Sequence, residues 1–183
     1  MNFDEIISNR RSARLFTSKN VSNKQIKKIL KSATLAPSAK NRQPWRFYIL
    51  NNEQKEYIKN MLFEWDNHNP KEKTSVKGTA EQINSANKMI MIYRKIYKSK
   101  SKNEFYQKPD YISLGCALEN MSLQAIDLGL GSCILCDTLY IEKEINDYLG
   151  IKDYEQICGF IIGYPIYNYP RKHKEKYENL ILF

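Results

Sequence analysis

Three arginines and a serine stand close together near the start of the chain, in the segment Asn9-Arg10-Arg11-Ser12-Ala13-Arg14. A guanidinium group is a flat, forked donor that fits phosphate oxygens, and a serine hydroxyl among such groups adds a further donor. Arg14 lies beyond the serine and could therefore reach a different part of the same ligand. The alternative is a solvated basic turn after a helix, which is the more common role of an arbitrary basic segment.

A second polar segment, residues 36–44, has a proline near each end and leads into a predicted strand at 46–50. Its Ser, Asn and Gln side chains both donate and accept hydrogen bonds, as the edge of a heteroaromatic ring requires. An ordinary connection between a helix and a strand would use the same residue types, because Ser, Asn and Pro are common turn formers. Taken alone, the segment leaves both interpretations open.

The elements that must position these segments are read from apolar periodicity and from capping residues. Ser22 is a plausible helix N-cap, because Gln25 follows it at the spacing of a capping box. Gly129 and Gly131 are expected to end the strongest helix by supplying positive φ angles. Residues 66–80 are polar and are expected to form a loop. The predicted helices are 3–9, 22–35, 53–64, 111–128 and 141–149, and the predicted strands are 46–50, 87–94 and 157–162. Residues 134–136 are expected to form a short strand or an extended loop.

The size and composition of the chain favour a single globular domain over residues 1–183. Hydrophobic residues make up 42% of the 183 residues, which is enough for a sizeable core. No apolar run approaches the ~18 residues of a membrane span, and the N-terminal residues lack the apolar centre of a signal peptide. We therefore expect a cytoplasmic protein without a membrane partner. The formal net charge of +9 favours anionic ligands.

The two polar segments together resemble the nitroreductase family of flavin enzymes. Residues 10–14 read RRSxR, and residues 37–47 read PSxxNxQPWxF about one helix later. Two further segments, residues 115–133 and the Gly-Tyr-Pro at 163–165, also resemble sequence motifs of this family. The resemblance covers nearly the full chain, and it implies an α+β fold: a three-layer α/β/α sandwich with a central, mostly antiparallel sheet. It also implies an intertwined homodimer, in which residues 166–183 form a C-terminal arm onto the partner subunit.

The same resemblance implies which residues bind flavin mononucleotide (FMN). Arg10 and Ser12 would bind its phosphate, and Arg11 would lie along the ribityl chain or the phosphate. Arg14 would lie near the pyrimidine edge of the ring, where a cation stabilises the charge of the reduced flavin. A second cation on the phosphate would come from Arg171 or Lys172.

The flavin ring would have a different set of neighbours. The resemblance implies that Pro37, Ser38 and Asn41 line the ring, from the other subunit. Leu135 and the backbone at Cys136 would face its opposite side. Members of the family usually have a glycine-rich motif at this position, whereas this chain has Leu135-Cys136-Asp137.

The four cysteines, Cys116, Cys133, Cys136 and Cys158, stand in apolar surroundings and are expected to be buried thiols. A thiol redox motif at Cys133 and Cys136 would need a strand before it, whereas a predicted helix closed by glycines precedes it. A zinc site would need a second pair of ligands at suitable spacing. We therefore expect a structural or flavin-lining role for this pair, and no metal site.

The implied activity is that of an FMN-dependent oxidoreductase that uses NADH or NADPH. It would reduce nitroaromatic, quinone or similar small acceptors by a two-electron ping-pong reaction. The flavin performs the chemistry, so no catalytic side chain is required. Residues 95–109 would form a lid over the active-site opening.

Two functions from other classes stay open. One is a flavin-binding or storage protein without efficient turnover. The other is a basic nucleic-acid-binding module, since residues 95–109 and 166–176 combine basic and aromatic side chains. The lid is preferred, because the basic segment is short and lacks the signature of a nucleic-acid-binding fold. We therefore expect no nucleic acid partner.

Overall fold

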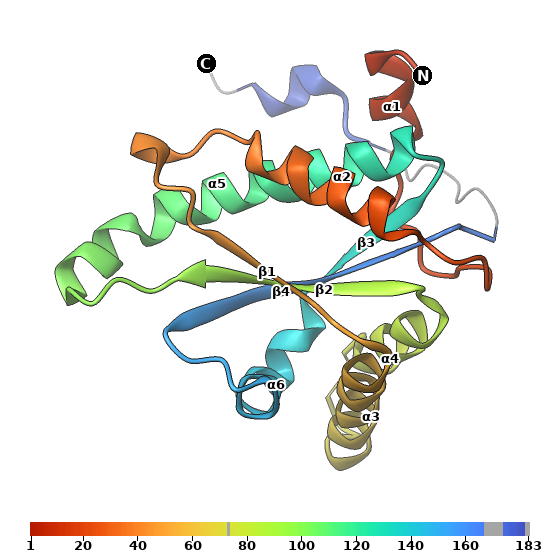
Figure 1. Ribbon diagram of the computed structural model, residues 1–183, viewed down its shortest axis with the longest axis vertical. Coiled ribbons are helices and arrows are strands. Elements are labelled where there is room, and N and C mark those ends of the chain that lie inside the picture. Colours follow the sequence, from red (N-terminus) through yellow and green to blue (C-terminus); the bar gives the residue numbers. More distant parts are fainter. Residues whose placement is uncertain (73, 167–173, 182–183) are drawn as a thin grey trace.

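The computed structural model of the chain describes residues 1–72, 74–166 and 174–181, and its centre is a four-stranded sheet (Figure 1). The strands are ordered β1-β2-β4-β3 across the sheet, and each neighbouring pair is antiparallel. The predicted antiparallel sheet is therefore confirmed. The strands are β1 (Trp45–Ile49), β2 (Lys88–Lys95), β3 (Gly131–Leu135) and β4 (Tyr154–Gly163).

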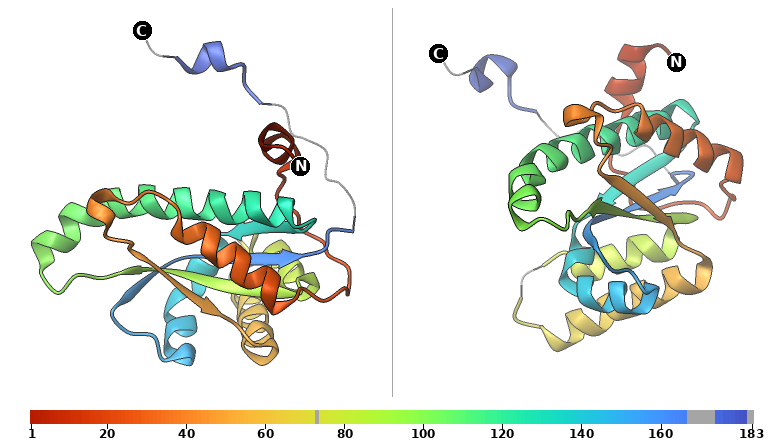
Figure 2. Two further views of the ribbon diagram at one scale, coloured as in Figure 1. Left: turned by 45° about the horizontal axis from the view of Figure 1, so that its top comes forward. Right: turned by 60° about the vertical axis from the view of Figure 1, so that its left-hand side comes forward.

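Helices lie on both faces of this sheet (Figures 1 and 2). The long helix α5 and the helix α2 cover one face, and α3, α4 and α6 lie on the other. The helices are α1 (Phe3–Asn9), α2 (Asn23–Thr34), α3 (Asn52–His68), α4 (Val76–Ser85), α5 (Lys100–Asp127) and α6 (Glu142–Leu149), with short 3-10 helices at η1 (Ala39–Asn41), η2 (Asp137–Ile141) and η3 (Tyr177–Leu180).

The central strand β2 supplies side chains to the core on both faces of the sheet. Met89, Met91 and Tyr93 pack in the cluster that contains the buried residues of α3 and α4. Ile90 and Ile92 point the other way and pack with the buried residues of α2 and α5. Successive side chains of a strand point to opposite faces, so a strand with helices on both sides is apolar throughout.

The predicted start of α2 is confirmed, together with its capping box. The backbone N–H of Gln25 donates to Ser22 Oγ at 3.3 Å, and the N–H of Ser22 donates to Gln25 Oε1 at 3.0 Å. These two bonds satisfy donors that a helix N-terminus otherwise leaves without partners. The same arrangement starts α3 at Asn51 and α1 at Asn2.

The expectation of a loop over residues 66–80 is wrong at both ends, because α3 continues to His68 and α4 begins at Val76. The buried face of α4 is narrow, and the polar residues around it make its apolar periodicity hard to recognise in the sequence. The first turn of α4 is tied to η2, because Ser75 Oγ and Thr79 Oγ1 donate to one carboxylate oxygen of Asp137 at 2.6 Å and 2.7 Å. Tertiary contacts of this kind stabilise helices that lack a strong local signal.

The expected lid, residues 95–109, is largely helical, because α5 begins at Lys100 and not at the predicted position 111. Every buried residue of α5 lies from Asp110 onward, so the first ten residues have no apolar stripe that a sequence pattern could reveal. Pro109 stands inside the helix, although proline removes one backbone hydrogen bond there. The hydroxyl of Ser113 donates to the Pro109 carbonyl oxygen at 2.8 Å.

Of the two glycines expected to end α5 by positive φ, only Gly129 does so, with a φ of +70°. The expectation is wrong for Gly131, whose φ does not lie in the left-handed region and which begins β3. A Cβ at Gly131 would lie 2.5 Å from the Cβ of Ala13. Gly131 is therefore required because another segment of backbone passes close to it.

Part of the expected C-terminal arm, including Arg171 and Lys172, lies outside the described residues. Within the described part, Tyr177–Leu180 forms a short 3-10 helix. Leu180 and Ile181 are exposed on this single chain. None of the helices that the structure describes is both long enough and apolar enough to cross a membrane.

Candidate functional site

The arginine segment lies along the outer edge of β3. Ser12 forms an isolated parallel bridge with Ser132, and the N–H of Ala13 donates to the Ser132 carbonyl at 2.9 Å. The small size of Gly131 permits this approach. Helix α1 leads into the segment and packs against α5. The backbone of the segment is therefore fixed by the sheet, and its side chains are not required to hold it there.

The three arginine side chains are engaged differently. Arg10 Nε lies 3.5 Å from Glu119 Oε1 on α5, in a partly exposed ion pair. Arg11 Nη1 donates to the carbonyl oxygens of Ser8 and Arg10, at 2.6 Å and 2.8 Å, and so closes the turn after α1. Its Nε is buried and has no hydrogen-bond partner among the described residues. Arg14 is exposed. This set of forked cationic donors suits a phosphate or another oxyanion.

The Cys133 thiol lies beside this segment. Burial raises its pKa, whereas the positive charge of Arg14 and a hydrogen bond with Ser12 act in the opposite direction. All four cysteines are free thiols, so the expectation that they form no disulfides is confirmed. The expectation of burial is wrong for Cys136, which is exposed at the start of η2.

Leu135 ends β3, and its side chain is buried in the core on the α3 and α4 side of the sheet. Any contact of Leu135 with a ligand would therefore come from its backbone. The next residue, Cys136, precedes η2 and is exposed. The short backbone turn at Leu135 and Cys136, between β3 and η2, is therefore the part of this segment that a ligand could approach.

The second predicted segment forms a tight loop around η1. Lys40, Asn41 and Gln43 have φ angles of 54°, 51° and 48°, a left-handed conformation that is uncommon for residues other than glycine. The N–H of Gln43 donates to Ser38 Oγ at 3.1 Å and so closes the loop. Such conformations cluster at ligand-binding sites, and the surrounding structure has to stabilise them.

A cavity of about 510 Å³ separates this loop from α5. Its lining is largely apolar, and Lys108 is the one charged residue among the described residues that line it. The loop forms one wall and the middle of α5 forms the other. Its lining residues are Pro37, Ser38, Ala39, Lys108, Pro109, Ile112, Ser113 and Cys116.

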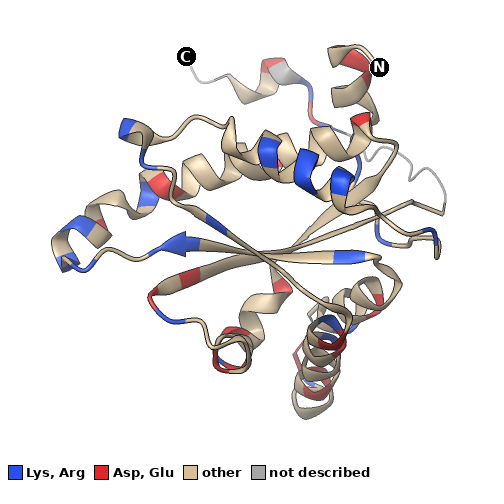
Figure 3. Cartoon of the chain, viewed as in Figure 1, with Lys and Arg blue, Asp and Glu red and all other residues tan. Residues whose placement is uncertain are grey.

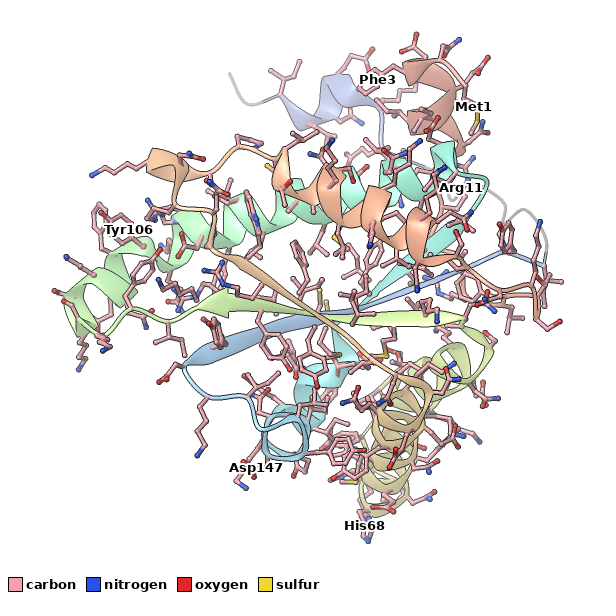
Figure 4. All side chains as sticks on the ribbon, viewed as in Figure 1. Met1, Phe3, Arg11, His68, Tyr106 and Asp147 are labelled. Carbon is pink, nitrogen blue, oxygen red and sulfur yellow. The ribbon has the colours of Figure 1, made fainter. Side chains whose placement is uncertain are left out.

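The two predicted segments do not meet within one chain. Figure 4 shows Arg11 near the C-terminal end of α5 and Tyr106 near the other end of that helix. The loop belongs to the Tyr106 end, because the guanidinium carbon of Arg42 lies 3.8 Å from the centre of the Tyr106 ring. The structure therefore separates Pro37, Ser38 and Asn41 from Arg10 and Ser12.

Sequence reasoning missed a cluster of charged residues behind the loop, formed by Arg42, Arg94 and Asp110. Arg94 is 1% exposed and Asp110 is fully buried. Burial lowers the pKa of Arg42, but its hydrogen bonds with Asp110 and Tyr97 raise it, and the net effect is a rise. One signal was available: Asp110 lies one helical turn before Leu114, on the predicted apolar face.

Basic residues are concentrated on one side of the sheet. Figure 3 shows Lys and Arg along α2, around η1 and at the N-terminal end of α5, and it shows acidic residues on α1, α3 and α6 as well as on other elements. Helix α2 contains four lysines and no acidic residue. This charge distribution gives an anion a favourable approach to the side of the molecule where α2 and α5 lie.

Comparison with known proteins agrees with the motifs. The sequence profile of the nitroreductase family matches residues 7–164. A protein of Archaeoglobus fulgidus with the provisional name NADH dehydrogenase/NAD(P)H nitroreductase is 29% identical, over 95% of this chain and 88% of its own. A BluB-like flavoprotein from Clostridium difficile has a TM-score of 0.83 at 27% identity and covers 100% of this chain and 99% of its own. A Desulfovibrio desulfuricans structure in complex with FMN, provisionally named a nitroreductase, has a TM-score of 0.82 at 21% identity, with 100% and 97% covered. The chain therefore belongs to the nitroreductase family.

Proposed function

We propose that the protein is an FMN-dependent NAD(P)H oxidoreductase that reduces nitroaromatic, quinone or similar small acceptors by a two-electron ping-pong reaction. The observation that carries the proposal is the arginine segment itself. Its backbone is fixed to β3 at Ser12, so several cationic donors can be directed at one ligand. Membership of the nitroreductase family and the FMN held by the Desulfovibrio desulfuricans protein support the same cofactor.

The residues present fit the phosphate end of FMN. Arg10 and Ser12 would bind the phosphate, and the buried Nε of Arg11, which lacks a partner in the described part of the chain, is a further donor on the same segment. Arg14 is exposed and would lie by the pyrimidine edge of the ring. Bound FMN would supply the transfer of electrons from the nicotinamide to the acceptor, and these residues would position and polarise it.

The ring would complete its site with residues of a second subunit. We propose that Pro37, Ser38 and Asn41 reach the ring bound to the partner, because one chain keeps them apart from its own arginine segment. Two further contributions complete the proposed site: the backbone at Leu135 and Cys136 on the opposite side of the ring, and Arg171 or Lys172 on the phosphate.

An intertwined homodimer would supply this second subunit. Exposed apolar side chains on α5 and near the chain end, among them Phe105, Ile112 and Leu180, give such a dimer a surface to bury. The proposed subunit is a single-domain, three-layer sandwich with residues 166–183 as an arm. Residues 95–109 would cover the opening of the cavity as a lid, and we propose a cytoplasmic location.

The visible absorption spectrum of the purified protein, before and after heat release of bound ligand, is the first test. We expect the two-band spectrum of flavin and the release of about one FMN per chain. A colourless protein that also fails to take up added FMN would contradict the cofactor proposal.

Oxidation of NADH and NADPH with a nitroaromatic or a quinone then separates an enzyme from a flavin-storage protein. We expect turnover with at least one nicotinamide. Flavin binding without turnover would favour storage. Binding to nucleic acid with a steep salt dependence, in the absence of flavin, would favour the third alternative.

A further inference from the structure

A buried ion-pair network lies where the loop around η1, the sheet and α5 meet. Trp45, Arg94 and Glu155 are register neighbours on β1, β2 and β4. Arg94 Nε donates to Glu155 Oε2 at 2.5 Å, and its Nη2 donates to the side chain of Asn103 on α5 at 2.9 Å. The N-terminal half of α5 is thus tied to the centre of the sheet.

Asp110 forms ion pairs with two arginines in this network, and it accepts a hydrogen bond from one of them, Arg42. Its Oδ1 lies 2.7 Å from Arg42 Nη2, and its Oδ2 lies 3.6 Å from Arg94 Nη1. Because Glu155 already compensates the charge of Arg94, the two arginines and two carboxylates balance one another. The shorter of the two contacts of Asp110 is the one with Arg42. A buried carboxylate strongly favours such a partner, because an unpaired charge in the interior is costly.

Arg42 in turn holds the loop in its strained conformation. Its Nη1 donates to the Ala39 carbonyl at 2.8 Å, across the left-handed residues Lys40 and Asn41. Its guanidinium also stacks on the ring of Tyr106 from α5. One side chain therefore closes the loop on itself and attaches it to the helix that forms the opposite wall of the 510 Å³ cavity.

We propose that Asp110 is a positioning residue, which through Arg42 fixes the loop of Pro37, Ser38 and Asn41 and so sets the width of the cavity that receives the flavin ring and the acceptor. The inference rests on the proposed function for what the cavity binds. Asp110 itself is fully buried and is not one of the described residues that line the cavity.

Two variants test the Arg42–Asp110 ion pair, each by changing one of its two residues. Arg42→Met removes the cation but leaves the Arg94–Asp110 ion pair in place, and we expect the variant to fold. Asp110→Asn removes the buried charge. Glu104→Gln is the matched control, because Glu104 lies on the same helix in an exposed pair with Lys100.

The first measurement is hydrogen exchange of the peptide that covers residues 37–43 in the purified protein. The second is the affinity of each variant for FMN. We expect faster exchange in this loop and an FMN dissociation constant raised about tenfold in Arg42→Met and in Asp110→Asn. The double variant should bind FMN no more weakly than either single variant, because both substitutions remove the same Arg42–Asp110 ion pair. Glu104→Gln should behave as the wild type.

Wild-type exchange and wild-type FMN affinity in Arg42→Met would overturn the inference. If Asp110→Asn does not fold, Arg42→Met decides the question alone. A partial recovery in Arg42→Lys supports the inference, because lysine restores the charge without the fork that spans Ala39 and Asp110. If the wild type binds no FMN, the proposed function fails, whereas exchange at 37–43 still decides whether the link fixes the loop.

Discussion

At the scale of single residues, the arginine segment divides its work between structure and binding. Arg11 uses one end of its guanidinium to close the turn after α1, and Arg10 is partly engaged by Glu119. Arg14 is exposed, and the one hydrogen bond of its side chain to a described residue is with the nearby Ser12 carbonyl, at 3.3 Å. Of the three, Arg14 therefore contributes least to the fold of the chain and is the best residue for a test of cofactor binding.

Arg14→Gln should weaken FMN binding about tenfold, because hydrogen bonds that involve a charged group contribute ~1.5–3 kcal/mol. The reduction potential of the bound flavin should fall, since a cation near the ring edge is lost. Equilibrium dialysis and a redox titration measure the two effects. Lys27→Gln, on the exposed face of α2, serves as the control and should change neither quantity. An unaltered affinity and potential in Arg14→Gln would show that Arg14 does not contact the ring.

The buried thiols predict a loss of stability in alkaline solution. Burial raises the pKa of Cys158 and of Cys133. Above about pH 8.5 the unfolded chain loses these protons while the folded protein keeps that of Cys158, so the free energy of unfolding falls by about 1.4 kcal/mol per pH unit for this thiol. Cys133 contributes in the same direction. Below that pH the contribution is fully present.

Urea unfolding at about pH 8 and about pH 10 measures this dependence. Between the two pH values, the free energy of unfolding of Cys158→Ala should fall by about 2 kcal/mol less than that of the wild type. Cys136→Ala removes an exposed thiol and should follow the wild type. Identical pH dependence in all three proteins would mean that Cys158 is not shielded from solvent.

At the scale of elements, the position of the arginine segment depends on a glycine. Gly131→Ala places a Cβ 2.5 Å from Ala13 and should force the segment away from β3. We expect a loss of ~1–3 kcal/mol in the free energy of unfolding, as for other overpacked sites, together with weaker FMN binding. Gly78→Ala, in α4, is the control: its Cβ meets only Gln82 Nε2, at 4.0 Å, and alanine should stabilise the helix by ~0.5–1 kcal/mol. Equal urea midpoints for the two variants would contradict this account.

Elements with a local signal could be predicted from the sequence, and elements without one could not. The capping box at Ser22 and the continuous apolar run at 87–94 are local features, and the predicted helix start and the predicted strand are confirmed. Helix α4 and the first ten residues of α5 depend on contacts with distant residues such as Asp137 and Arg94, so no local pattern reveals them. The burial of Asp110 has the same origin. The residues predicted for cofactor binding came from the family motifs, and those assignments stay predictions.

At the scale of the whole molecule, one chain leaves apolar side chains exposed on the helix that would form a subunit interface. Ile112 on α5 is 71% exposed, beside the cavity. Ile112→Glu should turn a dimer into a monomer, because an unpaired charge in an apolar interface costs several kcal/mol. Light scattering coupled to size-exclusion chromatography measures the mass, and circular dichroism checks the fold.

Lys152→Glu, an exposed charge change in the loop before β4, should leave the dimer intact. If flavin binding is lost together with the dimer in Ile112→Glu, the second subunit contributes to the site. A wild-type protein that is monomeric and still binds FMN would contradict the two-subunit site.

The pairing of Ser12 and Ala13 with Ser132 also has a consequence for solubility. An uncovered strand edge is a template on which other chains add strands and aggregate. Here the segment that would bind the phosphate also covers the outer edge of β3. Any change that loosens the segment, whether loss of the anion or a larger side chain at Gly131, would expose that edge. The bound cofactor would then reduce aggregation, and protein from which it has been removed would precipitate sooner than protein that retains it.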